Sequence, residues 1–222
     1  MTSTAILSKL QELEYANMDN NPIIAHLLDV WKREELQAIA GKDGGSAIKA
    51  CIAFAKECAK RDIQPALQGA FMQDGSQWLC NGYLGVKMSN PIDGLPQVDS
   101  ALATFDLAAV YNSHEGNAVD MPLDNLPSVG KLRAELAGYK AAHDAAYRKH
   151  NPATTDIKTT DEGAPACYDC KLLMMALECA GNLDRATVVI KTTKDHNGEP
   201  CNIGPIMLYG DNATVIVLPI RR

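Results

Sequence analysis

Hydrophobic positions recur with the spacing of amphipathic helices along much of the chain. Apolar side chains three or four positions apart share one helix face, so each such stretch is expected to pack on a core. Residues 124–150, which are rich in Ala and Lys, form the longest helical pattern, with breaks indicated at Pro127 and Gly130. The predicted helices cover residues 4–17, 22–40, 46–61, 124–150 and 168–180.

Strand-like runs fall into two groups. In the first, residues 66–72 and 77–83 flank Asp74-Gly75, a pair typical of a β-hairpin turn, and residues 84–88 continue the pattern. The second group follows the helix at 168–180 and consists of residues 186–191, 206–209 and 214–219. Residues 118–123 predict one more strand, whereas 101–111 fit either helix or strand. Helices followed by antiparallel strands predict an α+β fold and not a doubly wound parallel sheet.

A polar segment at 151–165, rich in Thr, Asp and Gly, is predicted to be a linker. Residues 1–40 are predicted to form an N-terminal helical extension of an α+β domain at 41–222. Within that domain we expect a first half at 41–123, a helical insertion at 124–150, the linker, and a second half at 166–222.

Composition and charge exclude several classes of protein. The 46% of hydrophobic residues excludes an intrinsically disordered chain. No apolar run approaches the roughly 18 residues that span a bilayer, and no export signal is visible, so a cytoplasmic protein without membrane contact is expected. The net charge of −6 excludes a protein that coats nucleic acid by bulk charge. Any contact with DNA must therefore be local, on one face, or absent.

Seven cysteines in such a protein are expected to be reduced thiols. Only the pair in Cys167-Tyr168-Asp169-Cys170 has a spacing that suggests chemistry. A structural zinc site needs a second such pair, which Cys179, Cys201 and His196 do not form. We therefore expect two small residues at a helix start, no metal and no cofactor. A cysteine-based metal-binding module is kept as an alternative.

Sequence signatures of enzymes are absent. The chain contains no Gly-x-Gly-x-x-Gly, no Gly-x-x-x-x-Gly-Lys-Ser/Thr and no His-Glu-x-x-His. Its five histidines are scattered, and none has a carboxylate or cysteine nearby at a catalytic spacing. No catalytic residue is assigned, and a small cytosolic enzyme of unrecognised type stays as the second alternative.

Three segments of the second half together resemble a known family. They are the helix beginning Cys167-Tyr168-Asp169-Cys170, the strand Pro205-Ile206-Met207-Leu208-Tyr209, and the ending Leu218-Pro219-Ile220-Arg221. This pattern is similar to the last repeat of the bacterial DNA polymerase III β sliding clamp. Residues 46–90 resemble an earlier clamp repeat more loosely, with a helix, a proline-led loop and a hairpin.

The resemblance implies a non-enzymatic, DNA-associated protein, either a processivity factor in replication or an adaptor. It implies helices inside a ring, strands outside, and a hydrophobic groove near the C-terminus for partner peptides. A ring built from single clamp domains would need about six copies of this chain, which is a homo-oligomer, or it would need a partner protein. Carried onto this chain, the peptide-binding residues are Val217, Leu218, Pro219, Ile220 and Arg221, while Arg222 stands where the family has Leu.

The candidate residues for double-stranded DNA are Lys49, Lys56 and Lys60, whose spacing places them on one side of a helix. Lysines on one helix face release counterions from phosphates when they bind DNA. The corresponding helix of the second half has Lys171 but also Glu178. An ordinary solvated helix face is the alternative interpretation.

Overall fold

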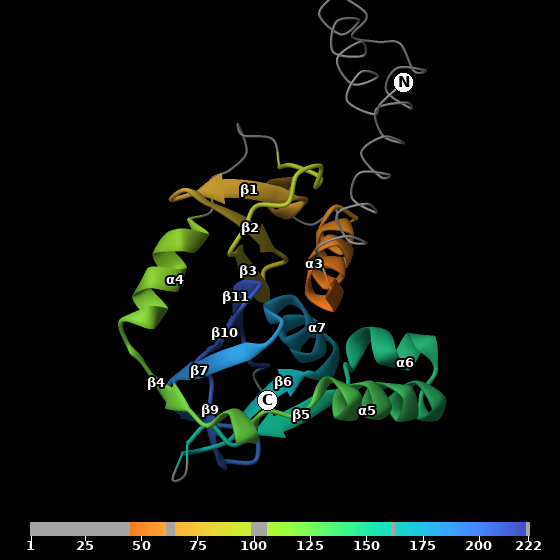
Figure 1. Cartoon of the computed structure of the whole chain (residues 1–222). Helices are drawn as coiled ribbons and strands as arrows, with labels where there is room; N and C mark the ends of the chain where they lie inside the picture. Colours follow the sequence, from red (N-terminus) through yellow and green to blue (C-terminus); the bar gives the residue numbers. More distant parts are fainter. Residues whose placement is uncertain (1–44, 61–64, 99–105, 161–162, 221–222) are drawn as a thin grey trace, which may run out of the picture.

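An antiparallel sheet of seven strands organises the computed structural model, which describes residues 45–60, 65–98, 106–160 and 163–220. The strand order is β1-β2-β3-β11-β10-β7-β4 (Figure 1). The predicted α+β fold class is therefore confirmed. The strands of this sheet are β1 Ala70–Gln73, β2 Ser76–Cys80, β3 Leu84–Met88, β4 Ala118–Met121, β7 Leu183–Val189, β10 Ile206–Gly210 and β11 Ala213–Val217.

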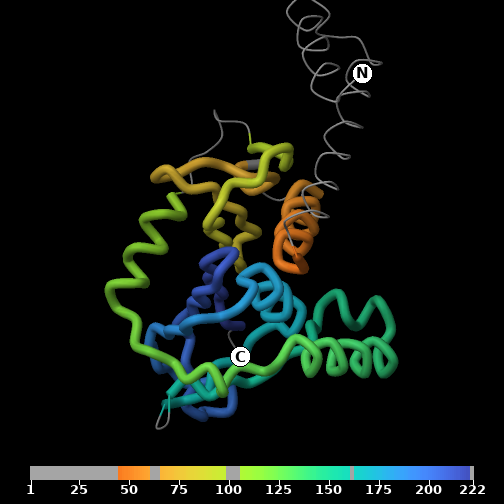
Figure 2. Tube along the Cα trace, in the orientation of Figure 1, coloured from red at the N-terminus to blue at the C-terminus, as the bar shows by residue number. Residues whose placement is uncertain are grey.

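The two halves of the chain contribute similar units to this sheet. In the first, helix α3 (Gly45–Cys58) precedes β1, β2 and β3; in the second, helix α7 (Cys170–Ala180) precedes β7, β10 and β11. The last strands of the two units, β3 and β11, pair antiparallel at the centre, with Val86 opposite Val215. Figure 2 shows these two segments side by side although they are far apart in sequence. Strands β7, β10 and β11, which correspond to the three strands predicted after this helix, are antiparallel neighbours as predicted, and β10 and β11 pack on α7.

The remaining elements lie around this framework. Helices α4 (Leu107–Glu115), α5 (Val129–Ala142) and α6 (Ala145–His150) join it, together with short 3-10 helices at Pro65–Leu67 and Leu123–Asn125. Two small antiparallel pairs also form. They are β5 (Thr154–Ile157) with β6 (Ala166–Asp169), and β8 (Thr192–Lys194) with β9 (Pro200–Asn202). None of the described helices has the length and hydropathy needed to cross a bilayer.

Each face of the sheet has its own core because side chains alternate along a strand. In β10, Ile206 and Leu208 belong to the core under α3 and α7. Met207 instead belongs to a second core with Trp78 and Leu107, beneath α4. Helices α3 and α7 accordingly lie on one side of the sheet and α4 on the other (Figure 1).

Gly85 of β3 allows α4 to approach the sheet. A Cβ at this position would lie 2.8 Å from Cγ2 of Ile216 and 3.3 Å from Cδ2 of Leu107. Real Cβ atoms do not tolerate the first of these distances, so the absence of a side chain is what permits the packing of α4. Leu107 and Ile216 are themselves 3% and 5% exposed, which leaves them little room to move.

Several predictions from the pattern needed correction. The helix predicted over 124–150 is two helices, because Ser128 caps α5 and the chain turns extended at His143 before Asp144 caps α6. The predicted linker at 151–165 contains strand β5, whose pairing with β6 orders it. The ambiguous stretch 101–111 is helical from Leu107 onward. The helices predicted at 4–17 and 22–40 lie outside the described residues.

We expect Gly85→Ala to lower the free energy of unfolding by about 1–3 kcal/mol, as overpacked cores generally do. Gly138→Ala is the matched control, because Gly138 lies within α5 with nothing within 4 Å of a built Cβ. That change should raise stability by about 0.5–1 kcal/mol through the helix propensity of Ala. Urea unfolding of both variants measures the difference. An unchanged Gly85→Ala midpoint would contradict the packing described for α4.

Candidate functional site

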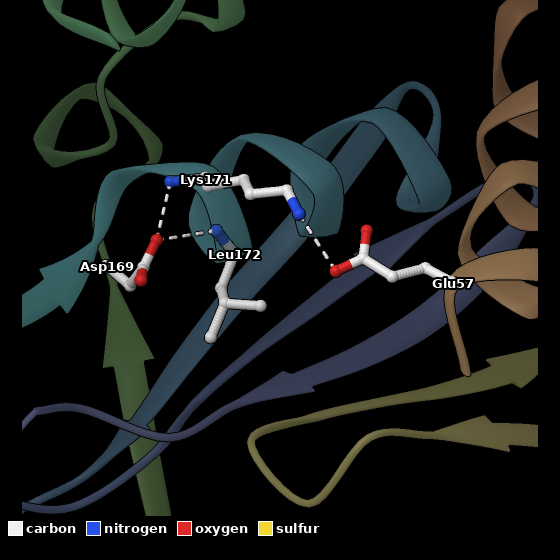
Figure 3. Close-up of polar contacts among 4 residues, drawn as sticks. All are labelled: Glu57, Asp169, Lys171 and Leu172. Atoms are coloured by element: carbon white, nitrogen blue, oxygen red, sulfur yellow. Dashed lines mark hydrogen bonds and ion pairs between the residues drawn. The ribbon is translucent and has the colours of Figure 1, made fainter. Parts of the chain in front are cut away.

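The start of α7 is fixed by Asp169, which lies between the two cysteines of the Cys-x-x-Cys segment. Its Oδ1 accepts hydrogen bonds from the backbone N–H of Lys171 at 2.7 Å and of Leu172 at 3.1 Å (Figure 3). These bonds satisfy two of the amides that a helix leaves unpaired at its N-terminus. Nζ of Lys171 then reaches Oε1 of Glu57 at 2.8 Å, which links α7 to the end of α3.

The three candidate DNA-binding lysines lie on the solvent side of α3. Lys49, Lys56 and Lys60 are exposed, whereas the opposite side of the helix is buried in the core. Lys60 follows the last helical residue, Cys58, by two positions. Within the described residues, none of the three lysines takes part in an ion pair. Their common face agrees with the spacing in the sequence.

On the helical surface, by which we mean the outer side of α3, α7 and α5, the carboxylates of α3 and α7 are paired with cations. Glu57 is the only carboxylate of α3 and Glu178 the only one of α7. Glu57 pairs with Lys171, and Glu178 pairs with Nη2 of Arg133 in α5 at 2.9 Å. Exposed pairs of this kind add little stability, about 0–1 kcal/mol. Because Glu57 and Glu178 are already paired, the acidic residues of α3 and α7 do not neutralise the positive charge of the α3 lysines.

A cavity of about 630 Å³ lies between the start of α3, α5, the end of α7 and the β10–β11 turn. The Arg133–Glu178 ion pair lines it, as does Asp211. Hydrogen bonds from the side chain and backbone of Asn182 hold the pKa of Asp211 below its usual range. Two carboxylates facing one guanidinium give this cavity no net positive charge, which disfavours an anionic ligand. Its lining includes Ser46, Ile48, Asn90, Val129, Leu177 and Asn212 and none of the predicted peptide-binding residues.

The residues predicted to bind peptides differ in their exposure. Val217 is fully buried in β11 and belongs to the main core, so it is not accessible to a partner. Leu218 is 37% exposed, and Pro219 and Ile220 are half-buried. Arg221 and the following residue, Arg222, lie outside the described residues. The backbone N–H of Ile220 donates to the carbonyl of Cys167 at 2.7 Å, which holds the segment against β6.

Tyr83 joins this C-terminal segment, although the sequence pattern did not single it out. The backbone N–H of Leu218 donates to the carbonyl of Tyr83 at 2.9 Å. The side chain of Tyr83 is 58% exposed and that of Leu218 is 37% exposed, so this bond brings two exposed apolar residues to neighbouring backbone positions, which we call the Tyr83–Leu218 patch. An isolated Tyr after Gly82 carries no signal in the sequence, because only the β3–β11 pairing brings it to the C-terminus.

The Cys-x-x-Cys cysteines lie in different elements, Cys167 in β6 and Cys170 at the first position of α7. Both are buried. Burial first, and then the nearby Glu135 carboxylate, raises the pKa of the Cys170 thiol to about 12. Its Sγ donates to Oε2 of Glu135 at 3.7 Å. Since zinc binding and thiol exchange both require a thiolate, this environment opposes them.

Other chemical groups do not converge in the described structure. Among the residues it describes, no three His, Cys, Asp or Glu side chains gather closely enough to hold a metal ion. All seven cysteines lie in the described ranges, and none forms a disulfide. No protein-family model, curated protein or solved structure matches this chain.

We expect iodoacetamide at mildly alkaline pH to alkylate Cys201 in the folded protein well before Cys170. Cys201 is the one cysteine that is not buried, whereas Cys170 keeps its proton at any pH well below 12. Peptide mass spectrometry at successive times measures both sites. Labelling in denaturant, where all the cysteines become accessible, is the control. Equal rates at the two sites in the folded state would show that Cys170 is reactive and would reopen the alternative of a cysteine-based metal-binding module.

Proposed function

We propose that this chain is a non-enzymatic, sliding-clamp-like protein of the cytoplasm that associates with DNA through its helical surface. The observation that carries the proposal is the joining of two helix-plus-three-strand units through their last strands. This arrangement places α3 and α7 next to each other on one side of a continuous sheet (Figure 1). A rigid sheet that presents two adjacent helices is suited to contacting a long, regular ligand.

The α3 lysines supply the charge for that contact. Lys49 and Lys56 are exposed two helical turns apart, and Lys60 extends the line beyond the end of the helix. Phosphate contacts of this kind position a duplex without reading its sequence. The rest of the chain carries an excess of acidic residues, so the contact would be confined to this face.

A single chain does not surround a duplex by itself. If one domain contributes to a ring, about six copies are required, which makes a homo-oligomer part of the proposal. If the chain stays monomeric, the same surface serves an adaptor that touches DNA on one side only. Light scattering of the full chain, with and without duplex DNA, distinguishes these two forms.

The wild-type protein should bind a fluorescent duplex at low ionic strength, with affinity that falls as salt rises. In Lys49→Glu with Lys56→Glu we expect affinity to drop about tenfold or more, and the salt slope to fall by about 1.8, near 0.9 for each lost phosphate contact. Fluorescence anisotropy across a salt series measures both quantities.

The matched control for the duplex experiment is Lys191→Glu with Lys194→Glu, an equal change of charge at exposed residues at and beside β8. This control should bind the duplex with nearly wild-type affinity. Absence of duplex binding by the wild-type chain at low salt, or equal losses in the two double variants, would refute a DNA contact at α3.

A second candidate function is the binding of partner peptides at the C-terminal segment. The specific observation that favours it is the exposed patch of Tyr83 and Leu218, with half-buried Ile220 beyond it. Apolar side chains exposed together on a surface often mark a protein contact. The proposed site therefore comprises Tyr83, Leu218, Pro219 and Ile220, without buried Val217.

Peptides selected by phage display on the immobilised full chain should be short and hydrophobic, and should bind in calorimetry. Tyr83→Ala with Leu218→Ala should weaken them about tenfold or more, because both apolar contacts are removed. Met72→Ala is the control, since Met72 is 56% exposed on edge strand β1. Peptides that lose as much affinity to Met72→Ala as to the double variant would place the site elsewhere.

A further inference from the structure

The arm formed by α5 and α6, residues 129–150, packs on α7 through α5 but contributes few buried residues to the core. Leu132 is the only buried residue of α5, and α6 buries none. The contact with α7 is made near the start of the arm, where Arg133 meets Glu178. Figure 1 shows both helices projecting from the helical side of the molecule. Burial in the core therefore does not explain the composition of these two helices.

The charge of the arm is opposite to that of the whole chain. It contains five cations and two carboxylates, a net charge of +3, in a protein whose net charge is −6. Glu135, one of the two carboxylates, faces the thiol of Cys170, and Asp144 accepts the backbone N–H of Tyr147 as the cap of α6. The cations are Lys131, Arg133, Lys140, Arg148 and Lys149.

A column of three aromatic rings follows the arm through the break between its helices. The ring centroids of Tyr139 and His143 are 4.6 Å apart. Those of His143 and Tyr147 are 4.5 Å apart, with the rings inclined by only 19°, a stacked arrangement. The hydroxyl of Tyr139 donates to the carbonyl of Asn151, which ties the column to the end of α6. The column ends at Tyr147, which is 49% exposed.

Two cations follow Tyr147 directly in α6, and Lys140 lies near the end of α5. Nη1 of Arg148 donates to the backbone carbonyl of Lys140 at 3.5 Å, so the side chain of Arg148 reaches back to α5. Lys149 follows directly and is exposed, as is Lys140. An exposed ring stacked on others, with cations around it, can stack on an unpaired base while the cations meet the neighbouring phosphates.

We propose that the arm binds single-stranded nucleic acid, with a base stacked on Tyr147 and phosphates at Lys140, Arg148 and Lys149. A duplex keeps its bases paired and offers none to the ring. An acidic peptide would use the cations but leave the aromatic column without a role. Binding is expected to tolerate different sequences, because every base presents a flat face. This site is separate from the α3 lysines and does not depend on them.

The first test measures the anisotropy of fluorescent oligo(dT) with the full chain at low ionic strength. Tyr147→Ala should weaken binding about tenfold through the lost stacking, while Tyr147→Phe keeps the ring and should bind nearly as well as wild type. Ile190→Ala is the control, because Ile190 is an apolar residue outside the arm that is 45% exposed, close to the 49% of Tyr147, and this change should leave binding unchanged. Circular dichroism of each variant verifies that the helices remain.

The second test separates the phosphate contacts from the stacking. Lys140→Gln with Lys149→Gln should lower the salt slope of oligo(dT) binding by about 1.4, near 0.7 for each phosphate contact. Lys49→Glu with Lys56→Glu should weaken duplex binding and leave oligo(dT) binding nearly intact. A wild-type chain that binds oligo(dT) but no duplex would therefore overturn the proposed function and not this site.

Three outcomes would overturn the arm proposal. They are no binding of oligo(dT) by the wild-type chain at low salt, equal binding by folded Tyr147→Ala, and displacement by polyglutamate at the same concentration as by unlabelled oligo(dT). The last result would identify an acidic protein as the partner. Retained binding by Tyr147→Phe together with loss in Tyr147→Ala would support a stacked base.

Discussion

The pairing of β3 with β11 is the interaction on which the rest of the structure depends. It joins strands more than a hundred positions apart in sequence, with Leu84 opposite Val217 and Met88 opposite Ala213. All four of these side chains belong to the core beneath α3 and α7. Without this pairing each half would expose an unpaired strand edge and one side of its helix. The pairing of β3 with β11 therefore creates both the continuous sheet and the adjacent pair of helices.

The helical insertion changes what such a pair of helices presents to solvent. Packing of α5 on α7 hides part of the second helix and neutralises Glu178 with Arg133. The exposed cations thereby lie on the two flanks, on α3 and on the arm with its aromatic column. A symmetrical inner surface of two equivalent helices does not describe this chain, because α3 carries exposed Lys49 and Lys56 whereas α7 carries only Lys171, which pairs with Glu57.

Local pattern predicted the parts of the fold that local forces determine. The Asp74-Gly75 turn, with positive φ at both residues, was evident from the residue types, as was the helix that Asp169 caps. The pairing of β5 in a segment that looked like a linker was not evident, because its partner β6 provides the order. The burial of Val217 and the exposure of Tyr83 were likewise hidden, since both follow from long-range pairing. The arm's aromatic residues recur every four positions, a signal that was present and overlooked.

The acidity of the chain and the basic arm have a common consequence for binding. An anionic ligand is repelled by most of the surface and attracted at few places, so it meets the molecule in a restricted set of orientations. Screening by salt weakens both effects, because the Debye length is about 8 Å at physiological ionic strength. Selectivity between paired and unpaired strands therefore cannot come from charge alone. In the proposed single-strand site it comes from short-range contact, because an unpaired base can stack on the exposed ring of Tyr147 whereas a base within a duplex cannot.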